Sequence, residues 1–213
     1  MKYPNLHDTL PKRIALIGVL FAVNSLAFMY LNENPFREPS YLPLIFIDEA
    51  IPFMPWTVWP YLLMLTSNII LPFLLRRDRL FRAVLLAYCV AISLNLMIWA
   101  GFPTAFPRPD LPLGDSMSES FYRWMVSFDS GTNCFPSGHV TIPTVLIWGL
   151  TVQWKKYRWW LWGALGISAM TILTTKQHYF WDLLGGLATA GVGIAVALIW
   201  LNRSSTTGRP NEG

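Results

Sequence analysis

Charged residues are scarce in this chain of 213 residues, because Asp, Glu, Lys and Arg together make up only 13% of it. A typical soluble domain has about a quarter. Hydrophobic residues account for 54% of the chain. A surface with so few charges is suited to lipid rather than to water. The net charge of +4 does not indicate a nucleic-acid partner, because the basic residues are distributed in a pattern typical of membrane topology.

Cysteine and histidine are also rare, with two and three residues. Cys89 lies inside an apolar run and Cys134 in a predicted loop, so we expect no disulfide between them. No spacing of His, Cys and acidic residues resembles a metal site, so neither a metal nor another cofactor is expected. Without internal repeats, residues 1–201 are predicted to form a single domain, and the polar residues 202–213 a disordered tail.

The apolar runs predict a polytopic bundle. A bilayer core of about 30 Å needs roughly 20 apolar residues per helix. Eleven Trp and eight Tyr fit a protein with two membrane–water interfaces. We therefore predict an all-α fold with six transmembrane helices. The predicted spans are residues 14–31, 59–75, 83–102, 140–154, 159–175 and 183–201. Residues 41–58 are apolar but contain Asp48, Glu49 and three prolines, which favours an interfacial or re-entrant segment.

The distribution of Lys and Arg predicts the orientation. Six spans place both termini on one side, and the segments of that side carry twelve Lys and Arg residues, against four in loops one, three and five. Cytoplasmic loops carry the excess of positive charge. Both termini are therefore predicted to be cytoplasmic, and loops one, three and five to face outward. Nine of the twelve acidic residues lie on the predicted outer side.

Two of the three histidines fall on that outer side. His139 lies in the stretch NCFPSGHVT, and His178 in TTKQHYFWDLLGG. The 39 residues between them fit two crossings of roughly 18 residues each with a short turn. Arg108 follows the third predicted span on the same side. We therefore expect both imidazoles and this guanidinium to meet at the outer face.

The residues around these histidines suit phosphate binding. Ser137 is a natural N-cap for the fourth span, and Gly138 allows another group to approach the backbone. The N-terminus of a helix offers free N–H groups and positive potential to an anion. Arg108 can bind phosphoryl oxygens through two N–H groups, and Lys176 can add a point charge.

His178 and Asp182 are four residues apart, so they can share one helix face. The carboxylate can hold one ring nitrogen as N–H and leave the other free as a nucleophile. Each residue also has a purely structural interpretation, since a single intramembrane His is often packed and Asp182 could cap a helix. Their joint placement on one side favours the functional interpretation.

The third loop contains a further predicted helix. Residues 115–129 carry an apolar stripe that includes Phe121 and Trp124, which is typical of a short amphipathic helix. Ser116 and Glu119 fit a capping box at its start, and Gly131 fits its end. Two interpretations stay open: a lid packed on the bundle, or a surface for lipid entry.

Three motifs resemble those of the type 2 phosphatidic acid phosphatase superfamily. They are PRP at 107–109, PSGH at 136–139 and a His and Asp four apart at 178 and 182, and the resemblance covers residues 101–186 closely. The wording QHYFWDLLGG is most similar to the inositol phosphorylceramide synthase-like branch and to many bacterial phosphatases. The resemblance implies an integral membrane enzyme, here expected in a bacterial inner (plasma) membrane with its active site facing outward.

The resemblance also implies catalytic roles without a metal. His178 would attack phosphorus, Asp182 would orient it, and His139 would protonate the leaving alcohol. The residues implied to hold the phosphoryl oxygens are Arg108, Ser137 and Gly138.

Two departures from the family pattern remove expected cations. Gly101 stands where the family usually has Lys, and Thr171 and Ile172 stand where it has Ser-Arg. Lys176 is a candidate replacement for one of them.

The function favoured by these residues is a phosphatase that acts on a lipid phosphate or diphosphate. A phosphotransferase of the same architecture, with an alcohol as acceptor, is the alternative. A transporter or non-catalytic lipid-binding protein gives no reason for the two histidines to meet. The expected partners are a lipid phosphate and membrane lipids. The choice between phosphatidate, phosphatidylglycerophosphate and polyprenyl diphosphate, and the formation of a homo-oligomer, are left open by the sequence.

Overall fold

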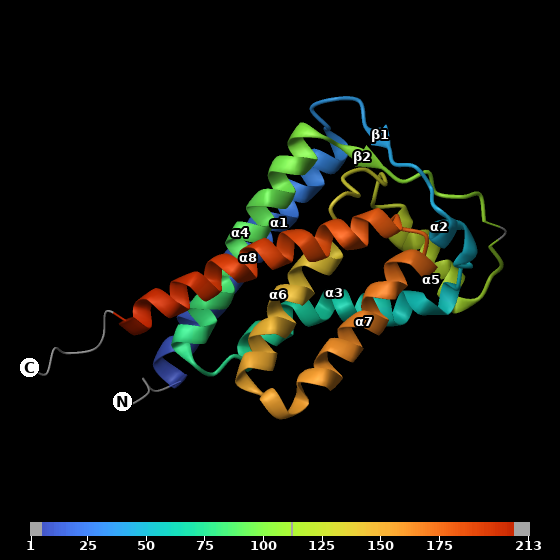
Figure 1. The fold of residues 1–213 in the computed structure, drawn as a ribbon. Helices are drawn as coiled ribbons and strands as arrows, with labels where there is room; N and C mark the ends of the chain where they lie inside the picture. The colour runs from blue at the N-terminus through green and yellow to red at the C-terminus, as the bar shows by residue number, and fades with distance from the viewer. Residues whose placement is uncertain (1–5, 112, 207–213) are drawn as a thin grey trace, which may run out of the picture.

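The computed structural model describes residues 6–111 and 113–206, and this part of the chain is built almost entirely from helices (Figure 1). Eight α-helices are present in it: α1 (Leu6–Glu33), α2 (Phe46–Ala50), α3 (Val58–Ile70), α4 (Asp78–Gly101), α5 (Met117–Val126), α6 (Gly138–Gln153), α7 (Arg158–Thr174) and α8 (Phe180–Thr206). Short 3-10 helices lie at η1 (Pro55–Thr57), η2 (Leu71–Leu74) and η3 (Lys155–Tyr157). The strands β1 (Ser40–Tyr41) and β2 (Thr104–Ala105) form one small parallel pair. The predicted all-helical class is confirmed.

Four helical stretches of the described chain are long and apolar enough to cross a membrane: Leu10–Glu33, Pro55–Leu74, Asp78–Gly101 and Phe180–Arg203. They correspond to the first, second, third and sixth predicted spans. The helices α6 and α7 have 16 and 17 residues, which is short for a crossing of roughly 20 residues. The count of six spans therefore stays a prediction.

The long helices leave large apolar side chains uncovered. On α1, Val19, Leu26 and Met29 are all more than half exposed. A water-soluble protein rarely exposes apolar surface on this scale, whereas helices that face lipid normally do. The chain is therefore a membrane protein.

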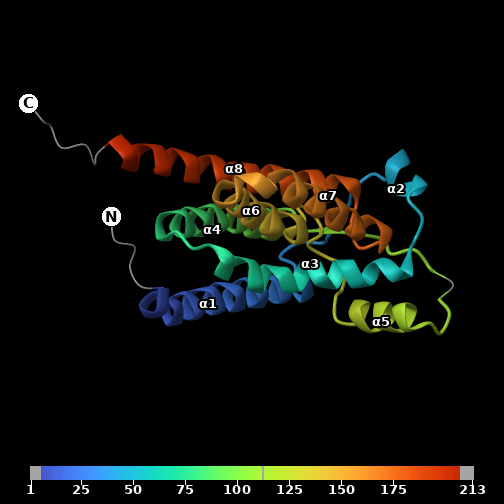
Figure 2. The same ribbon diagram turned by 90° about the horizontal axis from the view of Figure 1, so that it is seen from below.

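The helices form a bundle in which α8 packs along α4, α6 and α7 form an antiparallel pair beside them, and α1 covers α4 (Figures 1 and 2). The start of α1 and the end of α8 lie at one end of the bundle, and the β1–β2 pair, α2 and α5 at the other. At the first end, Arg13 forms an ion pair with Asp78 and donates to the carbonyl of Leu75 at 2.5 Å. Gln153 at the end of α6 donates to the carbonyl of Leu74, and Arg79 donates to that of Leu201, so the described basic residues near these positions lie at the same end.

Three glycines of α8 allow close helix packing. A Cβ on Gly185 would lie 2.5 Å from the Phe135 ring, and one on Gly193 would lie 2.3 Å from the carbonyl oxygen of Ala87. On Gly186 it would meet the carbonyl oxygen of Ser137 at 2.6 Å. A fourth glycine of α8, Gly191, has nothing within 4 Å of such a Cβ and so does not share this role.

The predicted third-loop helix is present as α5, but it is shorter than residues 115–129. The capping box is confirmed, since Ser116 and Glu119 bond each other's backbone N–H groups. Gly131 does not end the helix, because α5 ends at Val126, although Gly131 does adopt a φ of 75° in the following loop. Whether α5 lies in the membrane interface stays a prediction. At the other end of the chain, α8 extends to Thr206, into the range predicted as a tail, and residues 207–213 lie outside the described residues.

Candidate active site

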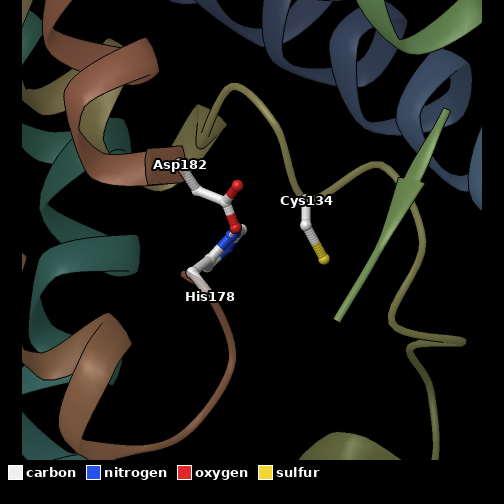
Figure 3. A group of neighbouring side chains, drawn as sticks. All are labelled: Cys134, His178 and Asp182. Carbon is white, nitrogen blue, oxygen red and sulfur yellow. Dashed lines mark hydrogen bonds and ion pairs between the residues drawn. The ribbon is translucent and has the colours of Figure 1, made fainter. Parts of the chain in front are cut away.

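The pair of His178 and Asp182 lies where the loop after α7 enters α8. Nδ1 of His178 is 3.0 Å from Oδ2 of Asp182, and that oxygen also accepts the backbone N–H of Tyr179 at 2.9 Å. Asp182 is fully buried and His178 is 8% exposed. Because a carboxylate accepts hydrogen bonds, this contact holds Nδ1 as N–H and leaves a lone pair on Nε2. Figure 3 shows the imidazole turned to this carboxylate.

Nε2 of His178 lies beside the start of α6. The hydroxyl of Ser137 is 3.4 Å from this nitrogen, and the backbone N–H of Ser137 donates to the carbonyl of Asp182 at 3.0 Å. Ser137 occupies the N-cap position of α6, as predicted, but its side chain does not cap the helix. Within the described residues, the N–H groups of Gly138 and His139 find no acceptor. A helix start with free donors therefore adjoins the free nitrogen of His178.

His139 lies next to His178. The two rings meet edge to face with their centroids 5.4 Å apart, and the ring of Tyr61 contacts His139 in the same way at 5.4 Å. Trp99 packs against the same turn, and it would lie 3.2 Å from a Cβ on Gly138. Both histidines line one cavity of about 300 Å³. The structure thus brings together the two imidazoles that lie 39 residues apart in the chain.

Arg108 is close to the pair but is already engaged. Its Nη2 donates to Oδ2 of Asp129 at 2.8 Å and to Oε1 of Gln177 at 3.1 Å, and its Nη1 donates to the carbonyl of Asp129 at 2.6 Å. Gln177 directly precedes His178 in the chain. The buried Nε of Arg108 has no partner among the residues that the structure describes. The guanidinium is thus held next to the histidine loop with one donor left for a ligand.

Lys176 is not brought to the histidines. Its ammonium donates to the backbone carbonyls of Asp48 at 2.7 Å and Ile51 at 2.5 Å. Burial lowers the pKa of Lys176, while the charge of Asp48 acts in the opposite direction. Lys176 also has a φ of 50°, in the left-handed region. In this arrangement the side chain fastens the loop rather than offering its charge to a phosphate.

Asp48 is a residue whose importance the sequence did not predict. It is buried, its Oδ1 accepts the N–H of Phe180 at 2.7 Å, and its Oδ2 accepts the N–H of Ile45 at 3.0 Å. Phe180 is the first residue of α8 and stands between His178 and Asp182. The segment that contains α2 therefore fixes the turn between His178 and Asp182. The signal in the sequence was an acidic residue in an apolar, proline-rich stretch, which predicted only an interfacial or re-entrant segment.

Cys134 completes a cluster that the sequence spacing did not reveal. Its sulfur lies with the ligand atoms of His178 and Asp182 in a group whose members are all within 4.8 Å of one another (Figure 3). The thiol donates to the carbonyl of Gly131 at 3.1 Å. Burial raises the pKa of Cys134 well above its usual range. A bound metal ion would itself deprotonate the thiol, so this cluster of possible ligands leaves the expected absence of a metal a prediction.

The positions of the missing cations differ in their surroundings. Gly101 ends α4, and a Cβ there would meet nothing within 4 Å. Thr171 and Ile172 are both buried, and Ile172 packs in an apolar cluster with Met64 and Leu173. Apolar packing thus occupies the place of the second cation.

Comparison with known proteins bears on this arrangement. No curated protein matches the chain significantly. A family model described as the PAP2 superfamily matches residues 46–196. The match spans the site from Asp48 through the histidine loop and most of α8. By this match the chain belongs to the PAP2 superfamily, whose members are phosphatases or phosphotransferases.

Proposed function

We propose that this protein is a metal-independent phosphatase that cleaves a membrane lipid phosphate or diphosphate through a phosphohistidine intermediate. The observation that carries the proposal is the position of the free Nε2 of His178. This nitrogen is oriented by Asp182 through Nδ1 and lies beside the uncapped start of α6. A nucleophile next to preorganised donors is the arrangement that phosphoryl transfer requires.

In the proposed first step, Nε2 of His178 attacks phosphorus and the bond from phosphorus to the alcohol oxygen breaks. His139 gives its proton to the leaving alkoxide, and Asp182 stabilises the positive charge on the substituted imidazole. In the second step a water molecule attacks the phosphorus, His139 takes a proton from that water, and the bond between Nε2 and phosphorus breaks. Inorganic phosphate leaves, and both histidines return to their starting state.

The phosphoryl oxygens would be held by groups that have no other partner. Among the described residues, the N–H groups at the start of α6 and the Nε of Arg108 are such groups. The hydroxyl of Ser137, which is 3.4 Å from Nε2 of His178, would turn to the phosphoryl group as well. Helix N-terminal N–H groups and a guanidinium are the usual ligands of phosphate. Lys176 would join them only if it released the carbonyls of Asp48 and Ile51.

In the membrane, we place α1, α3, α4, α6, α7 and α8 as six spans, with the site facing outward and both termini in the cytoplasm. Exposed tryptophans support this placement, because they mark both ends of the bundle: Trp56 and Trp124 near the site, and Trp159 and Trp160 at the end with the basic segments. Tryptophans gather at membrane–water interfaces. In a bacterium, the inner (plasma) membrane would hold the protein.

A phosphotransferase is the second candidate, and one observation favours it. The cavity at the histidines is lined by no Lys or Arg of the described chain. A phosphomonoester dianion needs more positive charge than a phosphodiester monoanion does. An alcohol could then take the place of water in the second step.

A direct test is a panel of lipid phosphates, offered to purified protein with and without candidate alcohols. The proposal predicts release of inorganic phosphate from at least one lipid by the wild type and none by His178→Ala. Consumption of the lipid with formation of a new ester would favour the transferase. No turnover of any lipid phosphate would contradict both.

A further inference from the structure

The cavity at the histidines continues into the interior of the bundle. Besides His139 and His178, this cavity of about 300 Å³ is lined by residues of α1, α3 and α4. A second cavity of about 60 Å³ shares Phe21, Asn68 and Ile142 with the first. The two cavities therefore adjoin at these three side chains, and together they trace a line between α1, α3, α4 and α6 that is called the path below.

The end of this path that is remote from the histidines is apolar. Its walls are mostly aliphatic or aromatic, and they include Leu20, Leu75, Val84, Leu85 and Leu146. Leu20 stands 13 residues before the end of α1 at Glu33, which corresponds to about 20 Å along the helix. The path thus runs from the site toward the middle of the proposed membrane region and not toward water.

Between the apolar end and the histidines, the wall carries uncharged amides without partners. Asn133 is 1% exposed, and neither its Oδ1 nor its Nδ2 has a hydrogen-bond partner among the described residues. Asn24 and Asn68 are half-buried residues, but their Oδ1 atoms are buried and also have no partner among the described residues. All three residues line the cavity at the histidines. Native proteins rarely leave buried amides unpaired, so three of them around one cavity indicate a ligand.

The backbone of Asn133 strengthens this point. Its φ of 57° lies in the left-handed region, which costs free energy for a residue other than glycine. The turn places the amide at the cavity, one residue before Cys134. Apart from the two histidines, no acidic or basic side chain of the described residues lines either cavity. The recognised group is therefore neutral and both donates and accepts hydrogen bonds.

We infer that this path is a binding site for one hydrocarbon chain of the lipid substrate, with the amides of Asn24, Asn68 and Asn133 at its neutral linkage. The phosphate would lie at His178, and a linkage with hydroxyl, ester or amide groups would pair with the three asparagines. The chain would then extend past Leu20 into the apolar cavity. This inference rests on the proposed function, because it takes His178 as the place of the phosphate.

The chemistry of each part of the path matches one part of such a lipid. An anionic group would have no cation to meet in the lower cavity, and a polyol would meet a wall with few hydrogen-bonding groups below Asn68. Burying polar groups without partners is costly. A lipid with a hydrocarbon chain below a polar linkage avoids this cost, because the chain lies in the apolar cavity and the linkage pairs with the amides.

The first measurement reports binding without turnover. The probe is a hexadecyl phosphate with a photoactivatable diazirine on its terminal carbon, incorporated in nanodiscs with the full chain carrying His178→Ala. We expect labelled peptides from the walls of the inner cavity on α1, α4 and α6, and competition by unlabelled hexadecyl phosphate. Labelling confined to outward residues of α1 such as Val19 and Leu26, or no labelling at all, would overturn the inference.

Two variants sharpen the test. Leu20→Trp fills the path, and its control Leu16→Trp places the same bulk on the exposed face of α1 one turn away. For Leu20→Trp we expect the ratio of kcat/KM for octadecyl phosphate to that for butyl phosphate to fall by about tenfold. Leu16→Trp should leave this ratio at the wild-type value. An equal ratio for both variants would overturn the inference.

Asn68→Leu removes the amide at nearly constant volume, with Thr66→Val as its control on the exposed side of α3. We expect KM for a lipid with a hydroxyl or amide linkage to rise by about tenfold in Asn68→Leu. The thermal midpoint should not fall, because a buried unpaired oxygen is lost. A lower midpoint with an unchanged KM would show a structural amide and refute its role in binding.

The two proposals fail in distinguishable ways. If the wild type released phosphate from no substrate, the proposed function would fall, while the labelling pattern would still decide whether a chain enters the path. The other case is that the wild type is active while the inner cavity is not labelled and Leu20→Trp has the same kcat/KM ratio as Leu16→Trp. That result would refute the path alone and leave the proposed function standing.

Discussion

The contact between α8 and the start of α6 gives a sharp test of how packing holds the site. A Cβ on Gly186 would lie 2.6 Å from the carbonyl oxygen of Ser137 and 3.0 Å from Cβ of Val140. That carbonyl accepts the N–H groups of Val140 and Thr141, so it cannot move without the first turn of α6. Normal contacts need about 3.5 Å. In Gly186→Ala the two helices must therefore separate by roughly 0.5–1 Å.

This displacement acts directly on the proposed nucleophile, because α6 carries Ser137 and α8 carries Asp182. Overpacking costs about 1–3 kcal/mol, of which the better helix propensity of alanine offsets up to about 1 kcal/mol. A misplacement of about 1 Å can cost on the order of 100-fold in rate. We therefore expect kcat of Gly186→Ala to fall about 10- to 100-fold with a modest loss of thermal stability.

Two glycines of the same helix serve as controls. A Cβ on Gly191 meets nothing within 4 Å, so Gly191→Ala should keep both kcat and the thermal midpoint. A Cβ on Gly193 would lie 2.3 Å from the carbonyl of Ala87 on α4, away from the site, so Gly193→Ala should lose stability but little kcat. The assay is phosphate release in detergent well below all three midpoints. Equal kcat for Gly186→Ala and Gly191→Ala would refute the reasoning, as would an equal loss in Gly193→Ala.

Three further predictions follow from the same contacts. Asp48→Asn should lower kcat about tenfold while KM changes little, because an amide cannot accept both N–H groups and an unpaired one costs about 1–3 kcal/mol; an unchanged kcat would remove Asp48 from the positioning of His178. An impermeant maleimide on intact cells should not modify native Cys134, which is buried and has a raised pKa. It should modify Asp115→Cys at once, and Lys156→Cys only after the cells are permeabilised. Modification of Lys156→Cys in intact cells, with Asp115→Cys modified only after permeabilisation, would show the opposite orientation. Phosphate release should survive EDTA, and complete loss that one added metal restores would contradict the metal-independent mechanism.

The sequence predicted those parts of the structure that depend on local pattern. Apolar runs located the long helices, and the predicted start of the third-loop helix at residue 115 is within two residues of the start of α5. The sequence also predicted that His139 and His178 lie on one side, because two crossings of known length connect them. These inferences needed only helix geometry and the thickness of a bilayer.

Contacts between distant segments were beyond such reasoning. The bond from Asp48 to Phe180 joins residues 132 apart, and the bond from Lys176 to Asp48 joins residues 128 apart. Charge alone suggested that Lys176 would bind a phosphate, whereas in the structure its ammonium donates to two backbone carbonyls, those of Asp48 and Ile51. Likewise, the ion pair of Arg108 with Asp129 depends on how the third loop folds back, which no periodicity records.

The central claim is that His178 is the nucleophile and His139 the general acid. It is tested most directly by rapid-quench labelling with an alkyl phosphate and an aryl phosphate. General acid catalysis is worth about 10²–10⁴-fold for a poor leaving group, and a phenolate leaves without much help. His139→Ala should therefore lose turnover of the alkyl ester but still form an acid-labile, alkali-stable phosphoenzyme from the aryl ester. His178→Ala should form none from either, whereas label on His178→Ala together with none on His139→Ala would contradict the account.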